Sequence, residues 1–183
     1  MSTLQSAPPA EAPKSAQEFF HLPAFPEAGP TVLTVISSNY IPDYVNQFDD
    51  ENKGAYPAVE FFLGAETSKG IGLVKTYPMR YSLHEKAGYT KFYKLASGKA
   101  PAAGSKPDDI YGKGISANIV NEDKVSKKGK AYTRSSVKDY AAVHPKLVGE
   151  ITPLAKLKPA LDAALAKKDG DKEGGKEGGN EPF

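Results

Sequence analysis

The residues best suited to bind a ligand lie in the segment 130–140, where positive charges and a tyrosine alternate with small side chains. Successive side chains of a β-strand point to opposite faces. One face of this segment would therefore carry Lys130, Tyr132, Arg134, Ser136 and Lys138. The other face would carry Ala131, Thr133, Ser135 and Val137, which are small enough to pack inside a barrel. Three cations beside an aromatic ring can hold the backbone of a single nucleic-acid strand and stack one of its bases.

Two neighbouring segments offer the same chemistry. The expected strand 71–78 would send Lys75 and Tyr77 to one side, and the basic turn SKKGK (126–130) would bind phosphates. We expect phosphate contacts from Lys75, Arg80, Lys127, Lys128, Lys130, Arg134 and Lys138. We expect base stacking from Tyr77, Tyr81 and Tyr132. The alternative is a solvated strand whose tyrosines only cover its own surface.

Residue types that perform catalysis are present but poorly arranged. The histidines at 21, 84 and 144 stand far apart and match no metal-ligand spacing. The segment GAETSKG (64–70) lacks the order of a Walker loop, because Lys69 precedes Gly70. The chain has no cysteine, which excludes a thiolate zinc site and a cysteine nucleophile. We therefore expect a protein that is not an enzyme and that uses no cofactor or metal.

Charge is unevenly distributed along the chain. The net charge is only +2, but residues 1–52 hold one lysine against seven acids, whereas residues 53–138 hold 16 basic residues against seven acids. Residues 169–183 are again acidic, with two lysines and five acids. A strongly basic middle between acidic ends predicts a polyanionic partner, and nucleic acid is the first candidate. A basic but merely solvated surface is the alternative.

Length and composition indicate one domain in the cytoplasm. A chain of 183 residues with 39% hydrophobic content can build one core and hardly two. No apolar run approaches the roughly 18 residues of a membrane span. The N-terminal residues MSTLQSAPPAEAPKSAQ have neither the basic start nor the apolar segment of a secretory signal.

Hydrophobic patterning places the elements that must position these residues. Residues 1–30, rich in proline and alanine, predict a disordered arm, and residues 39–54, with Pro42, predict a long connection. We expect strands over 31–37, 55–65, 71–78, 114–121 and 131–140. In the fourth strand, Ile115, Ala117 and Ile119 should form the buried face.

Two helices are expected. The first should run from Ser82 to Gly98, with Ser82 and Glu85 as a capping box and Gly98 as the C-cap. Its Tyr89, Phe92 and Ala96 should pack on the sheet. The second should span 152–168, where Pro159 must kink the helix or start its second part. A flexible, glycine-rich acidic tail, 169–183, follows.

Three strands, a helix and two further strands follow one another in the order of the five-stranded OB-fold barrel, whose helix lies between strands three and four. We therefore expect a mainly β OB-fold domain over 31–151, followed by the helix 152–168. A generic α+β sandwich could produce the same order of elements.

Three stretches resemble the single-stranded DNA-binding proteins of bacteriophages and bacteria. They are YPMRYSLHEKAGYTKFYKLASG (77–98), the basic hairpin SKKGKAYTRSSV (126–137) and the tail that ends in Pro-Phe. The resemblance covers about a third of the chain. It implies a protein that coats single-stranded DNA during phage replication, recombination or repair. By the same resemblance, Glu181, Pro182 and Phe183 would recruit replication or recombination proteins, although this tail is diluted by glycine and two lysines.

Two other functions remain open from the sequence. An RNA-binding OB module would use the same charges and rings. A structural or scaffold protein of a virion would use the basic face to meet another protein. The sequence does not determine the oligomeric state, so a second copy of the chain is also a candidate partner.

Overall fold

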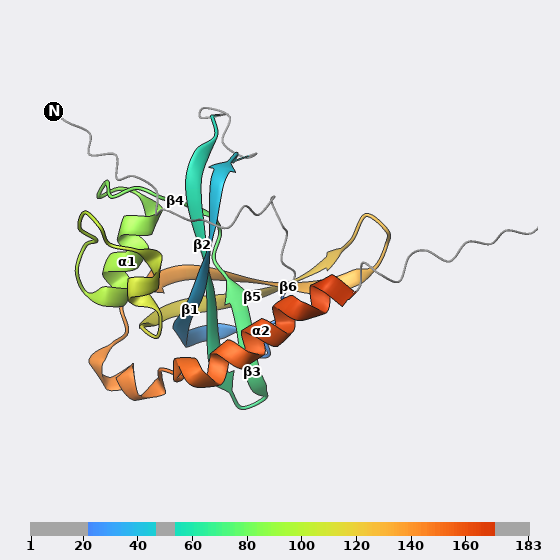
Figure 1. The fold of residues 1–183 in the computed structure, drawn as a ribbon. Helices are drawn as coiled ribbons and strands as arrows, with labels where there is room; N and C mark the ends of the chain where they lie inside the picture. The colour runs from blue at the N-terminus through green and yellow to red at the C-terminus, as the bar shows by residue number, and fades with distance from the viewer. Residues whose placement is uncertain (1–21, 47–53, 171–183) are drawn as a thin grey trace, which may run out of the picture.

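The computed structural model describes residues 22–46 and 54–170, and these residues fold around one antiparallel sheet (Figure 1). The strands are β1 (Gly29–Tyr44), β2 (Tyr56–Thr67), β3 (Gly70–Lys75), β4 (Met79–Arg80), β5 (Gly114–Val125) and β6 (Ala131–Ala141). The α-helices are α1 (Gly88–Ser97) and α2 (Leu154–Gly170). Two short 3₁₀ helices, Pro107–Ile110 and Pro145–Glu150, lie in the connections.

The sheet curls into a nearly closed barrel. Its strand order is β3-β2-β1-β5-β6, and β4 pairs with β2. β3 and β4 act as one interrupted third strand, because the N–H of Thr76 still donates to the carbonyl of Phe61 and the N–H of Tyr81 to that of Pro57. Since β6 also approaches β3, five strands close around one interior. The expected OB-like barrel, with a helix between its third and fourth strands, is confirmed.

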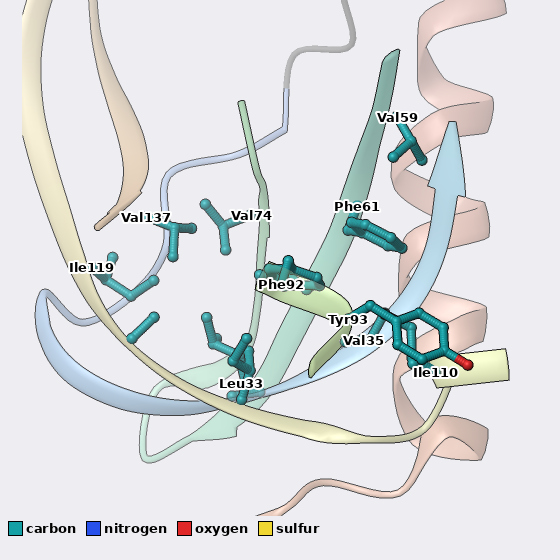
Figure 2. Close-up of a cluster of buried hydrophobic side chains, with 14 of the residues drawn as sticks. Leu33, Val35, Val59, Phe61, Val74, Phe92, Tyr93, Ile110, Ile119 and Val137 are labelled. Carbon is teal, nitrogen blue, oxygen red and sulfur yellow. The ribbon is translucent and has the colours of Figure 1, made fainter. Parts of the chain in front are cut away.

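The barrel interior is filled by side chains from all of its strands (Figure 2). Phe61 of β2 lies at one end of this core, where Phe92 stacks on it at 4.7 Å between ring centroids and Tyr89 at 6.3 Å. Both rings come from α1, which therefore closes that end of the barrel. The predicted packing of Tyr89 and Phe92 is confirmed, and so is the buried face made by Ile115, Ala117 and Ile119.

α2 covers part of the outer face of the sheet. Its Leu157 and Leu161 are buried against Ile36, Phe62 and Leu73. The helix does not start anew at Pro159 but includes this residue in its second turn. A proline there removes one backbone hydrogen bond. The two buried leucines on either side of it offset this loss.

α1 begins later than the sequence predicts. It starts at Gly88, and Ser82 does not cap it. Instead, the hydroxyl of Thr90 donates to the carbonyl of Ser82 at 2.8 Å, and the N–H of Lys86 donates to Nδ1 of His84 at 3.2 Å. Such local bonds between side chain and backbone compete with helix formation. The predicted C-cap is confirmed, because Gly98 adopts a φ of 81° and its N–H donates to the carbonyl of Lys94.

The domain begins before residue 31, so the predicted arm is wrong for residues 22–30. Phe25 is 1% exposed and belongs to the main core. Its N–H donates to Oγ of Ser135, and its carbonyl accepts from Nδ2 of Asn121. A Cβ at Gly72 would lie 2.5 Å from the Phe25 ring, which shows how closely the ring fits against β3. The predicted disorder of residues 1–21 and 169–183 concerns positions that, apart from 169 and 170 at the end of α2, lie outside the described residues.

β1 is also longer than predicted. It continues through Pro42 to Tyr44, so the predicted connection is wrong over 39–44. Pro42 falls in an irregularity of the ladder between Ile41 and Tyr44, where a strand can accept a residue without an N–H donor. Residues 47–53 of that connection lie outside the described residues.

Gly72→Ala should destabilise the fold by about 1–3 kcal/mol, because the added methyl group overlaps the buried Phe25 ring. Urea unfolding followed by circular dichroism measures this change. Gly149→Ala is the matched control, since its Cβ would meet nothing within 4 Å. Equal unfolding midpoints for the two variants would contradict the close fit of Phe25.

Candidate nucleic-acid interface

The β5–β6 hairpin extends beyond the barrel as a two-stranded ribbon (Figure 1). β1 pairs with β5 only as far as Ile119, whereas β5 and β6 pair up to Val125 and Ala131. The turn at its tip is closed by the N–H of Ser126, which donates to the carbonyl of Lys130, and Gly129 adopts a φ of 77° there. Lys127, Lys128 and Lys130 are all exposed on this turn.

One face of the ribbon turns away from the barrel. Ile119 and Val137 are paired and buried, so their faces of β5 and β6 point inward. By alternation, Tyr132, Arg134 and Lys138 lie on the outward face, as the sequence predicts. All three are exposed. We call this surface the outward face of the ribbon.

The inner face of β6 differs from the prediction. Only Val137 of the four small residues is buried in the barrel core. Ala131 is exposed, and the hydroxyl of Thr133 donates to Asp123 on the neighbouring strand. Ser135 is bound to Phe25 and Asn121 rather than packed among apolar side chains. The reason is that the ribbon leaves the barrel before these positions, so there is no interior for them to fill.

Tyr77 joins the third strand to the ribbon. It lies two residues after the end of β3 and is 56% exposed, and the guanidinium of Arg134 lies over its ring at 5.9 Å from the ring centroid. Burial, followed by the charge of Tyr77, raises the pKa of the neighbouring Tyr140. The structure thus brings Tyr77 and Arg134 together, although 57 residues separate them in the sequence.

A second arginine also lies on a tyrosine. The guanidinium of Arg80 is 5.0 Å from the centroid of the Tyr56 ring. Tyr44 packs its ring against Tyr56 with an edge-to-face geometry at 5.6 Å. The sequence alone does not reveal Tyr44 and Tyr56 as part of this site. Tyr44 falls in the predicted connection, and the pairing of β2 with β4, which brings Tyr56 to Arg80, is not readable from the chain order.

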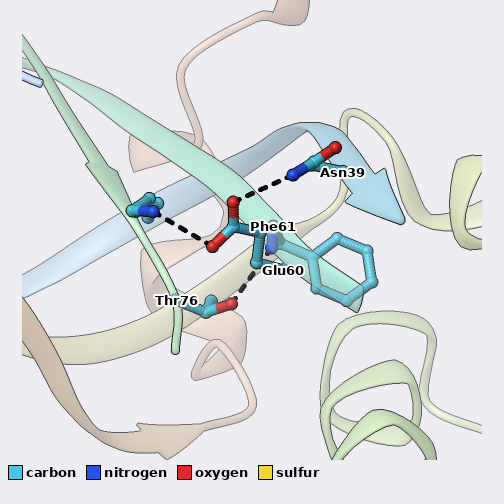
Figure 3. A network of polar contacts seen from close by, with 5 residues as sticks. Asn39, Glu60, Phe61 and Thr76 are labelled. Carbon is cyan, nitrogen blue, oxygen red and sulfur yellow. Dashed lines mark hydrogen bonds and ion pairs between the residues drawn. The ribbon is translucent and has the colours of Figure 1, made fainter. Parts of the chain in front are cut away.

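Lys75 is held by a buried acid (Figure 3). Its ammonium lies 3.1 Å from Oε2 of Glu60, whose side chain is only 3% exposed. The other carboxylate oxygen accepts from Nδ2 of Asn39 at 3.1 Å. Glu60 was not among the predicted residues. Its charge neutralises that of Lys75, which leaves Lys75 less available to phosphates than the lysines of the ribbon.

Tyr81 is less exposed than a stacking platform requires. Its ring packs between Tyr40, at 5.8 Å, and Tyr89, at 4.8 Å. Burial, followed by the charge of Tyr40, raises the pKa of Tyr81. Of the three tyrosines predicted to stack bases, Tyr77 and Tyr132 present open rings, whereas Tyr81 helps to hold α1 on the barrel.

The ribbon is basic even after its acids are counted. Glu122, opposite Arg134, forms an ion pair with Lys124 at 2.9 Å, and this bond lowers the pKa of Glu122. Asp123 accepts the Thr133 hydroxyl on the other face. The three lysines of the turn, Arg134 and Lys138 form no ion pair within 22–46 and 54–170.

The described residues contain neither a cluster of metal ligands nor a helix suited to cross a membrane. No group of three or more His, Cys, Asp or Glu side chains is placed to hold a metal ion among them. None of the helices in this part of the chain is both long and apolar enough to cross a membrane. Glu181, Pro182 and Phe183 lie outside the described residues.

Comparisons with protein-family models, curated proteins and solved structures give no match for this chain.

Lys75→Met should lower the unfolding free energy by about 1–3 kcal/mol, because it leaves the buried carboxylate of Glu60 without its cation. Adding Glu60→Gln should recover part of this loss. Lys124→Met is the control, since its partner Glu122 is solvated, and it should leave the unfolding midpoint unchanged. A Lys75→Met protein as stable as the wild type would show that the Glu60 pair is unimportant.

Proposed function

We propose that this protein binds single-stranded DNA with little sequence preference and protects it during replication, recombination or repair. The observation that supports this most directly is the outward face of the ribbon. There Tyr132, Arg134 and Lys138 stand in one row beside the exposed ring of Tyr77, next to a turn with three exposed lysines. Cations that follow a backbone, with rings on which bases stack, are the parts a single-strand binder needs.

The position of this surface on the barrel also supports the proposal. OB-folds bind oligonucleotides on the face of strands two and three and on the loops that join strands one to two and four to five. Here the β5–β6 ribbon is the four-to-five connection. Arg80 lies in β4, the second part of the interrupted third strand, and Tyr77 lies in the gap between its two parts. This argument is an analogy between folds, so it adds to the chemistry of the residues without replacing it.

Single strands fit this surface better than duplexes. A tyrosine can stack only on a base whose face is free, and the bases of a duplex cover one another. Every base has such a face, so stacking on Tyr132 would not select a sequence. A duplex would meet the same lysines but would gain nothing from the rings.

The tail has a separate proposed role. Glu181, Pro182 and Phe183 would dock in pockets of replication or recombination proteins, with the Phe183 ring in an apolar pocket. This part of the proposal rests on the resemblance of the tail. The assignment to phage DNA metabolism in a bacterial cytoplasm rests on the resemblance of all three stretches, 77–98, 126–137 and the tail.

Fluorescence anisotropy with a labelled oligonucleotide of about 30 nucleotides tests the proposal at two salt concentrations, against its duplex. We expect tighter binding of the single strand and a slope of log affinity against log salt of about −0.7 for each phosphate neutralised. Equal, weak binding of both would overturn the proposal and favour a protein-binding role for the basic face. A ribose oligomer bound more tightly than its deoxyribose counterpart would favour the RNA module.

Tyr132→Ala should weaken binding by about 1–3 kcal/mol on homopolymers of each base alike. Val125→Ala is the matched control, because Val125 is 70% exposed on the opposite face of the same ribbon. A loss confined to one base would mean that Tyr132 takes part in sequence readout. Equal affinities for the two variants would remove Tyr132 from the interface.

A further inference from the structure

Both arginines of the chain lie on tyrosine rings. Of 24 basic residues only Arg80 and Arg134 are arginines, and all others are lysines. Arg80 lies over Tyr56 and Arg134 over Tyr77. Among the described residues, arginine thus stands at two places where a tyrosine ring lies beneath the cation.

The two arginines are held by rings rather than by acids. Within 22–46 and 54–170, the ion pairs involve Lys75, Lys124 and Lys156 but neither arginine. Both arginine side chains belong to exposed residues. A guanidinium is planar, weakly hydrated and able to stack, which an ammonium is not. An exposed guanidinium that lies over a tyrosine ring can present the opposite side of its plane to a nucleotide.

The two arginine–tyrosine pairs flank the ion pair of Lys75 and Glu60. Tyr56 lies four residues before Glu60 on the same face of β2, and Tyr77 lies two residues after Lys75, between β3 and β4. Three residues separate Tyr77 from Arg80, or roughly 10 Å of extended chain. One nucleic-acid strand that follows the third strand would meet both.

We propose that Arg80 and Arg134 are platforms for base stacking, supported from below by Tyr56 and Tyr77, and that their main contact is with bases and not with phosphates. Guanidinium planes stack on unpaired bases in the same way as aromatic rings. The inference rests on the proposed binding of single-stranded nucleic acid. In this arrangement both arginines stack on bases, whereas the sequence predicts that they bind phosphates. Tyr77 supports Arg134 from below and does not itself stack on a base.

Substitution by lysine separates the two roles, because it keeps the charge and removes the plane. We expect Arg80→Lys and Arg134→Lys each to weaken binding of a thymidine oligomer about tenfold, within the range known for loss of one stacked base. The salt slope should stay unchanged, since no phosphate contact is lost. Lys146→Arg, at an exposed position of the 3₁₀ helix Pro145–Glu150 outside the proposed interface, is the control and should bind like the wild type.

An oligomer of abasic sites provides the second measurement. It presents the same phosphates without bases, so the difference between wild type and Arg80→Lys should disappear on it. Tyr56→Ala should reproduce the loss seen with Arg80→Lys on the thymidine oligomer, whereas Tyr56→Phe, which keeps the ring, should not. Circular dichroism melting of each variant shows whether it is folded, and the exposed position of both arginines predicts that the lysine variants are.

The outcomes separate this inference from the function on which it rests. If the wild type binds no single strand, the proposed function is wrong. If it does, but the lysine variants bind equally well, or lose as much on the abasic strand, the arginines are phosphate contacts and only the stacking inference fails. A smaller salt slope in Arg80→Lys would have the same meaning.

Discussion

The stack of Phe92 and Tyr89 on Phe61 is the contact on which the candidate surface depends. It anchors α1 in the open end of the barrel, and it fixes the odd-numbered side chains of β2 toward the interior. The even-numbered side chains, Tyr56 and Glu60 among them, must then point outward. A slip of one residue would exchange the two faces of the strand. The outer surface is therefore set by what the core accepts, before any ligand is considered.

The same logic explains what the sequence could predict. Ile115, Ala117 and Ile119 alternate with polar residues, so the inward face of β5 was readable, and with it the outward row on β6. The start of α1 and the burial of Phe25 were not readable. The first depends on local hydrogen bonds around Ser82, and the second on a space opposite Gly72 that exists only after β3 has formed.

Long-range pairing explains the misjudged parts of the candidate site. A count of charges along the chain treats Lys75 as one more cation, but folding places it against the buried Glu60. Tyr56 falls inside the predicted strand 55–65, and only the pairing of β2 with β4 brings Arg80 beside it. In both cases the partner lies 15 residues or more away, so spacing alone carries no signal. The cations available to a polyanion are thus fewer than the 16 basic residues of 53–138, and five of those without an ion pair among the described residues lie on the ribbon.

The choice between arginine and lysine carries information that total charge does not. A surface that only attracted phosphates could use either residue, and this chain uses lysine almost everywhere. Its two exceptions lie on rings supplied by strands that are distant in sequence, in one case with Tyr44 packed behind the ring. Such stacked sites form only when strands that are distant in sequence have come together. The lysines of the turn need only the β5–β6 hairpin. The ribbon turn would therefore give charge and reach, and the two arginine–tyrosine pairs would give a fixed geometry, so that affinity for a single strand depends on unpaired bases as well as on charge.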